Sequence, residues 1–183
     1  MDRQTRVALL VDHAKRPRHH GPLEDADVHM PGGNPGCGDV VTIHVKAEPG
    51  EARIREVRFE GAGCTISQAA ASILVERMNK RRPTFDEIGA LSYEDMIDVL
   101  GRDIVGSRPR CATLALGTLK AAVQHVEMDR KLRAAGRTEE EIERMREALA
   151  AQAAGTGLVF GAGAEAAVAA AGVVPHDDAI EPA

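Results

Sequence analysis

Two β-branched segments separated by a Pro-Gly turn constrain the fold of this chain more than any other feature. VVTIHVKA, residues 40–47, alternates apolar and polar side chains, and IREVRFEG, residues 54–61, places Val57 and Phe59 on one face. This period of two is typical of strands that bury one face. Because Pro49 and Gly50 lie between the segments, we expect an antiparallel hairpin, with His44 on its exposed side. DVHM, residues 27–30, is expected to form a short edge strand before a Pro-Gly-Gly turn.

Helical periodicity dominates most of the remaining sequence. Apolar side chains recur at helical spacing in residues 3–15, 65–80, 92–100 and 111–126. Ser92 is placed to cap the third of these helices, and Gly101 to end it. The expected fold is therefore α+β, with a short antiparallel three-stranded sheet packed against helices and a helical C-terminal extension.

The composition changes after residue 126, which suggests two parts. Thr138 and Glu141 form a capping box for a charged helix. From about Ala154 the sequence is mostly Ala, Gly and Val. We expect one domain over residues 1–126 and an extension over residues 127–183, helical at first and then Ala/Gly-rich and mobile.

Composition and charge exclude several classes of function. The chain has 183 residues and 44% hydrophobic residues, enough for one full core, but only 2% are aromatic and none is Trp. Few aromatic side chains and a net charge of −5 argue against a nucleic-acid partner. No run of eighteen apolar residues and no secretory leader are visible. We therefore expect a cytoplasmic protein that neither spans nor binds a membrane.

The three cysteines all lie at predicted boundaries between elements. Cys37 stands between two glycines after a turn, Cys64 follows a strand and begins a helix, and Cys111 begins another helix. The N-terminus of a helix favours a thiolate over a thiol. An odd number of cysteines in a reducing compartment argues against disulfides. Metal ligands, nucleophiles and ordinary buried thiols remain as the possible roles, the last of these above all for Cys111.

A shared site would have to be assembled by the fold, because Cys37, Cys64 and Cys111 are far apart in the sequence. None of their spacings matches the CxxC pairs of zinc fingers. Asp39 is two residues from Cys37 and can complete a set of three thiolates and one carboxylate, which suits tetrahedral Zn²⁺ or iron. Arg110 is placed to stabilise thiolate charge or to contact a partner, and an ordinary solvated arginine fits its position equally well.

Three motifs, taken in order, resemble the U-type iron–sulfur cluster assembly proteins, the family of IscU and of the N-terminal part of NifU. They are NPGCGD (34–39), FEGAGCTISQAAAS (59–72) and RPRCATLALGTLKAAV (108–123), and the resemblance covers about residues 3–126. It is closest to the SufU branch of the SUF system. IscU-type members have a histidine before the third cysteine and a Pro-Val-Lys loop for a chaperone, whereas this chain has Arg110 and GSRPR (106–110) there.

The resemblance implies a SufE/NifU-like fold and a role in iron–sulfur cluster assembly. It implies that Cys37, Asp39, Cys64 and Cys111 hold zinc or iron and a transient iron–sulfur cluster. Persulfide sulfur would come from a SufS-like cysteine desulfurase, which supplies the pyridoxal phosphate (PLP), so this chain would carry no PLP of its own. Cys37 matches the sulfur acceptor of SufU-like members, and Cys111 is the second candidate because the third cysteine has that role in IscU-like members.

Three functions therefore stay open at the level of the sequence. The first is a scaffold or relay that accepts persulfide sulfur and passes a cluster to apo iron–sulfur acceptor proteins. The second is an enzyme, a zinc-dependent sulfurtransferase that never holds a cluster. The third is a zinc-stabilised adaptor without catalysis, so the sequence does not decide whether the chain is an enzyme.

Overall fold

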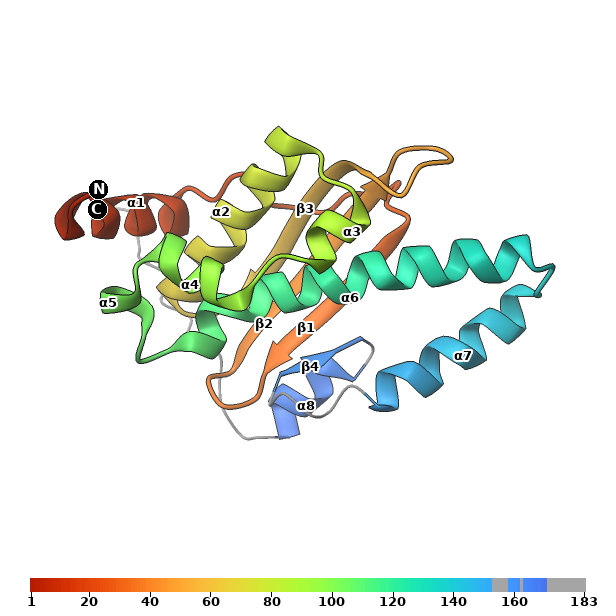
Figure 1. Ribbon diagram of the computed structural model, residues 1–183. Coiled ribbons are helices and arrows are strands. Elements are labelled where there is room, and N and C mark those ends of the chain that lie inside the picture. Colours follow the sequence, from red (N-terminus) through yellow and green to blue (C-terminus); the bar gives the residue numbers. More distant parts are fainter. Residues whose placement is uncertain (153–157, 162, 171–183) are drawn as a thin grey trace.

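A single antiparallel sheet and the helices that cover it form the fold (Figure 1). The computed structural model describes residues 1–152, 158–161 and 163–170. In chain order its elements are α1 (Arg3–Lys15), β1 (Val28–Asn34), β2 (Asp39–Ala47), β3 (Ile54–Ala62), α2 (Thr65–Arg81), α3 (Phe85–Gly89), α4 (Tyr93–Leu100), α5 (Arg102–Val105), α6 (Pro109–Ala134), α7 (Glu139–Gln152), β4 (Val159–Phe160) and α8 (Ala164–Ala170).

The sheet has the strand order β3-β2-β1-β4, and all neighbouring strands are antiparallel. The predicted hairpin is confirmed as β2 and β3, in which Ile43 pairs with Phe59 and Val45 with Val57. These four side chains are fully buried under α2 and α6, which lie across the same face of the sheet (Figure 1). The predicted α+β class is therefore confirmed, and a fourth strand from the C-terminal extension joins the expected three.

β1 is longer than the sequence predicts and is not an edge strand where it meets β4. The expected turn at Pro31, Gly32 and Gly33 is wrong, because these residues continue the strand and Gly32 and Gly33 pair with β4 on one side and β2 on the other. Pro31 has no N–H, but its carbonyl accepts a hydrogen bond of 2.7 Å from the N–H of Gly161. A Cβ at Gly32 would lie 2.0 Å from Thr118 Oγ1 in α6. The glycine is needed there for close packing rather than for a turn.

The alternation of side chains along β1 assigns its residues to the two faces of the sheet. Gly32 faces α6, whereas a Cβ at Gly33 would lie 2.8 Å from both the Ala164 carbonyl oxygen and Val168 Cγ2 of α8. Successive strand residues point to opposite faces, so α8 packs on the face opposite to α6. Asn34 is two positions after Gly32 and continues the row that faces α6.

The C-terminal extension packs against the sheet in its described parts. α6 runs to Ala134, so the predicted division after residue 126 falls inside this helix, and that division stays a prediction. α7 leads the chain back towards β4 and α8, beside β1 (Figure 1). The predicted capping box is confirmed, with Thr138 and Glu141 exchanging hydrogen bonds of 3.0 and 3.3 Å. The rest of the Ala/Gly-rich stretch that we expected to be mobile lies outside the described residues.

The length of α6 does not make it a membrane span. It has 26 residues but carries charged side chains along it, Lys120 and Arg130 among them. Across the three described ranges, no helix is both long enough and apolar enough to cross a bilayer.

Two buried histidines have a lowered pKa. The prediction that His44 lies at the surface is wrong: it is only 4% exposed, its Nδ1 lies 2.7 Å from His29 Nδ1, and its Nε2 lies 3.0 Å from Glu60 Oε2. Burial lowers the pKa of His44 and the neighbouring His29 lowers it further, against the opposing effect of Glu60. His13 is buried as well, with Nδ1 2.8 Å from Ser72 Oγ, and burial lowers its pKa.

We expect these two histidines to make the fold acid-sensitive. Because their pKa is lower in the folded chain, the unfolded chain binds protons first as the pH falls. Their stabilising effect is complete above the unfolded pKa of about 6.5. Below it, each histidine should reduce the free energy of unfolding by about 1.4 kcal/mol per pH unit until its folded pKa is reached.

Urea unfolding at about pH 7.5 and about pH 5.5 measures this effect. A variant that combines His13→Gln and His44→Gln should show a shallower pH dependence over this range than the parent chain. An equal dependence in both proteins would contradict the assignment to these two residues.

Candidate metal centre

Cys37 lies at the tip of the tight hairpin that joins β1 to β2. Asn34 and Asp39 are cross-strand partners on either side of this turn. The Asn34 carbonyl accepts hydrogen bonds from the backbone N–H groups of Cys37, 3.0 Å, and Gly38, 2.9 Å. Gly38 has a φ of +75°, which glycine adopts without strain. The turn leaves the Cys37 side chain only half-buried.

The other two cysteines lie at the N-termini of the two helices that cover the sheet. Cys64 is the N-cap residue of α2, and its backbone N–H donates a hydrogen bond of 2.9 Å to Asp39 Oδ1. Gly63 allows this approach, since a Cβ there would lie 2.7 Å from the same oxygen. Cys111 is in the first turn of α6 behind Pro109, and it is only 1% exposed.

Of the four side chains that the resemblance implied as ligands, three form a compact group at this end of the sheet, and the fourth, that of Cys64, contacts this group through Asp39. The ligand atoms of Cys37, Asp39 and Cys111 lie within 4.8 Å of one another. The Sγ atoms of Cys37 and Cys111 are 3.4 Å apart. The Sγ of Cys64 is 3.8 Å from Asp39 Oδ2. The fold therefore assembles one cluster from three separate segments.

The distance between two of the candidate donor atoms is close to the value expected on a tetrahedral metal ion. Zn²⁺ binds thiolates at about 2.3 Å, so two sulfurs on one tetrahedral ion are about 3.8 Å apart. The Cys37–Cys111 distance of 3.4 Å needs only a small outward movement to reach this value. Three thiolates with one carboxylate also suit iron. The assignment of Cys37, Asp39, Cys64 and Cys111 as ligands remains a prediction that this geometry supports.

The thiols of Cys64 and Cys111 differ in acidity. A hydrogen bond from the Cys111 thiol lowers the pKa of Cys64 to about 6, and the backbone N–H groups of Ser67 and Ile66 in the first turn of α2 act in the same direction, against burial and the charge of Asp39. The same interaction with Cys64, together with burial, raises the pKa of Cys111. Cys64 is therefore the more acidic of these two thiols.

Two arginines surround the cluster, and one of them could not be singled out from the sequence. Arg108 donates a hydrogen bond to the Cys64 sulfur, which raises the pKa of the Arg108 guanidinium. Arg110 lies near the turn of Cys37, where its Nη1 is 3.9 Å from the position of a Cβ at Gly36. The sequence signal for Arg108 was the RPR run directly before the helix of Cys111. The role of Arg110 as a tuning or partner residue stays a prediction.

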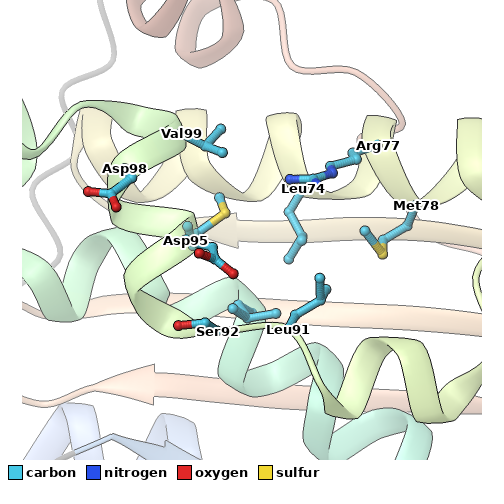
Figure 2. Close-up of a pocket in the computed structure, with 10 residues that line it drawn as sticks. Leu74, Arg77, Met78, Leu91, Ser92, Asp95, Asp98 and Val99 are labelled. Atoms are coloured by element: carbon cyan, nitrogen blue, oxygen red, sulfur yellow. The ribbon is translucent and has the colours of Figure 1, made fainter.

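A separate hollow of about 400 Å³ contains none of the four candidate ligands. Figure 2 shows Leu74 and Met78 from α2 on one side of it, and Leu91, Ser92 and Asp95 on the other. Its walls are mainly apolar, and it contains neither a thiol nor a histidine. The chemistry of this fold is therefore expected at the cysteine cluster.

Comparison with known proteins identifies relatives of this chain. The iron–sulfur cluster assembly scaffold protein IscU of Thermotoga maritima is 34% identical over 131 residues, which cover 64% of this chain and 91% of the relative. The zinc-dependent sulfurtransferase SufU of Bacillus subtilis is 30% identical over 130 residues, covering 63% of this chain and 86% of the relative. The predicted resemblance to U-type proteins is thereby confirmed.

A solved structure and a family model lead to the same conclusion. The structure is that of a proposed iron–sulfur cluster assembly scaffold protein for the SUF system from Fervidobacterium islandicum AW-1. It is 27% identical and superimposes with a TM-score of 0.54 over 63% of this chain and 93% of that one. The family model described as NifU-like N terminal domain matches residues 6–133, so the extension after residue 133 lies outside it. Because this match spans more than half of the sequence, the chain belongs to the family of NifU-like N-terminal domains.

Proposed function

We propose that this chain, an iron–sulfur cluster assembly scaffold of the IscU/SufU type, accepts persulfide sulfur on Cys37 from a PLP-dependent, SufS-like cysteine desulfurase. The sulfur is then relayed, or built into a nascent cluster for apo iron–sulfur acceptor proteins. The names of the relatives support both halves of the proposal, since one is a zinc-dependent sulfurtransferase and another is an assembly scaffold.

The unequal accessibility of the sulfurs carries this proposal. Cys37 is half-buried at the tip of a turn, between two glycines, whereas Cys111 is 1% exposed at the start of a long helix. A sulfur that must meet a cysteine of another protein has to reach the surface. Cys64 is also half-buried, but it is the N-cap residue of α2 and its backbone is hydrogen-bonded to Asp39, whereas Cys37 lies in a turn between two strands.

The transfer itself is a thiolate exchange that needs no oxidant. The Cys37 thiolate attacks the terminal sulfur of the desulfurase persulfide, a new S–S bond forms on Cys37, and the desulfurase cysteine leaves as a thiolate. Zinc, when bound, keeps the cysteines deprotonated and orders their loops. Arg108 places positive charge beside the Cys64 sulfur, and Arg110 places it near Gly36, the neighbour of Cys37; both charges favour the approach of an anionic persulfide.

A reconstituted reaction tests the proposal. The full chain, with its zinc content measured, is mixed with a SufS-like cysteine desulfurase and cysteine, and alanine release is followed with and without a zinc chelator. We expect zinc-dependent stimulation, and peptide mass spectrometry should find one added sulfur atom on Cys37. Cluster absorbance after iron is supplied, followed by transfer to an apo acceptor, separates a scaffold from a pure sulfurtransferase.

The Cys37→Ala variant is the central comparison in this experiment. It should reduce alanine release to the rate of the desulfurase alone, while Thr65→Ser, an exposed change beside Cys64, should not. Full stimulation by Cys37→Ala would overturn Cys37 as the acceptor, and added sulfur on Cys111 instead would transfer that role to the second candidate. If neither stimulation nor a cluster is observed, the zinc-stabilised adaptor is the function that remains.

A further inference from the structure

Asn34 contacts the cysteine cluster although it is not one of the expected ligands. Its side chain is fully buried, and its Nδ2 donates a hydrogen bond of 3.7 Å to the Sγ of Cys111. Its Oδ1 is also buried and has no hydrogen-bond partner among the described residues. A buried amide with an unsatisfied oxygen is unfavourable for folding, so the stability of the core does not explain an asparagine at this position.

The position of Asn34 in β1 directs it to this contact. Gly32, two residues earlier, faces Thr118 of α6, and Asn34 points to the same face. α6 begins beside it and carries Cys111 in its first turn. At the same time the Asn34 carbonyl holds the backbone N–H groups of Cys37 and Gly38. One residue therefore links the turn of Cys37 to the sulfur of Cys111.

Asn34 and Asp39 each form a hydrogen bond with one of the other two cysteines. They are paired across the hairpin, with Cys37 in the turn that separates them. The Asp39 carboxylate binds the backbone N–H of Cys64, and the Asn34 amide binds the sulfur of Cys111. Cys37 has a hydrogen bond to its backbone N–H, but its sulfur, unlike that of Cys111, has no amide donor among the hydrogen bonds of the described residues.

We propose that Asn34 is a positioning residue that holds Cys111 as the fixed ligand of the metal centre and leaves Cys37 as the ligand that leaves and reacts. An N–H···S hydrogen bond engages a lone pair of the sulfur, which makes that sulfur a poorer nucleophile and a better-oriented ligand. Burial of Cys111 acts in the same direction. This inference rests on the proposed function, because it explains why Cys37 rather than Cys111 accepts sulfur.

Competitive alkylation of the zinc-loaded full chain tests the inference. Iodoacetamide is added below the concentration of thiols, and peptide mass spectrometry measures how the label is divided among Cys37, Cys64 and Cys111. In the parent chain Cys37 should be labelled fastest. In Asn34→Ala the ratio of Cys111 to Cys37 labelling should rise about tenfold, and the zinc dissociation constant should rise by a similar factor, as is typical for an outer partner of a metal ligand.

Two further variants keep the test decisive. Asn34→Leu has a similar shape and removes the unsatisfied oxygen, so it should fold even where Asn34→Ala does not, and it should show the same change in labelling. Gln68→Ala is the matched control, because it removes another side-chain amide, one that donates a hydrogen bond of 3.0 Å to the Gly61 carbonyl. Among the hydrogen bonds of the described residues, this amide has none to a sulfur, so the substitution should leave the labelling ratio unchanged.

The outcomes separate this inference from the proposed function. An unchanged ratio in zinc-loaded Asn34→Leu would overturn the role of Asn34, whatever the desulfurase experiment shows. Absence of added sulfur on Cys37 in the parent chain would instead overturn the proposed acceptor. A cobalt-substituted chain gives an independent readout, because loss of the N–H···S bond should shift its sulfur-to-metal charge-transfer band in the Asn34 variants and not in Gln68→Ala.

Discussion

Replacing Cys64 by serine should weaken zinc binding by at least about a hundredfold. Loss of a residue that only supports a metal ligand weakens binding by up to about a hundredfold, and loss of the ligand itself should have at least that effect. The fold without metal should remain at least as stable as in the parent chain. Cys64 is the N-cap of α2 and makes no side-chain cap hydrogen bond. Serine is a preferred N-cap residue, and its hydroxyl can accept from the N–H groups of the first turn, which is worth about 0.5–2 kcal/mol relative to alanine.

The two effects of this substitution have opposite signs because they concern different atoms. The backbone N–H of Cys64 that binds Asp39 Oδ1 is kept, so the link between β2 and α2 survives. The sulfur, whose pKa is lowered by its surroundings, is replaced by a hydroxyl that stays neutral and is a hard, weak ligand for zinc.

Zinc titration against a competing chelator and thermal unfolding with and without zinc measure both effects. Bound zinc should raise the unfolding temperature of the parent chain and not that of Cys64→Ser. Thr65→Ser, one position further into the helix, is the control and should bind zinc like the parent. Zinc affinity equal to the parent in Cys64→Ser would remove Cys64 from the ligand set.

The features that could be predicted from the sequence are those decided by neighbouring residues. The period-two pattern of residues 40–47 and 54–61 was sufficient for the β2–β3 hairpin. Ser92 caps α4 as expected, with its hydroxyl accepting from the N–H of Glu94 at 3.1 Å. Each of these signals lies within a few residues of the structure that it specifies, so no knowledge of the rest of the chain is needed.

The features that could not be predicted depend on segments distant in the sequence. Pro31, Gly32 and Gly33 have the composition of a turn, but the glycines are there because α6 and α8 approach the strand on its two faces. His44 follows the polar row of its strand, yet it is buried between His29 and Glu60. Residue type indicates such positions only after the packing partners are known.

The candidate site divides in the same way. The motifs around Cys37, Cys64 and Cys111 implied a shared cluster, and the fold brings these residues together with Asp39. The residues around the cluster were not visible in advance. The position of β1 against α6 directs the Asn34 side chain to the Cys111 sulfur. Arg108 is the N-cap residue of α6, and this position brings it to the Cys64 sulfur.

The C-terminal extension should prove to be a structural part of the sheet, and Val168→Asp should release it. Val168 is 3% exposed on α8, with its Cγ2 close to Gly33 of β1. Burial of a valine side chain contributes about 1.5 kcal/mol or more, and an unpaired carboxylate is not tolerated in its place. We therefore expect α8 to leave the sheet and the free energy of unfolding to fall by at least about 1.5 kcal/mol.

Loss of α8 should destabilise β1 and the turn that follows it. β4 comes directly before α8 and pairs with Gly32 and Gly33. Release of β4 together with α8 would expose backbone groups of β1, which can then pair with another chain. Asn34 comes directly after Gly33, so zinc affinity should fall together with stability. Urea unfolding, hydrogen exchange of β1 peptides, size-exclusion chromatography and zinc titration measure these effects.

The control variant is Ala166→Asp, which places the same charge on the exposed side of α8. It should change the free energy of unfolding by less than about 0.5 kcal/mol. Parent-like exchange and stability in Val168→Asp would mean that the extension does not hold β1 in solution, and that the turn of Cys37 is supported by α6 and β2 alone.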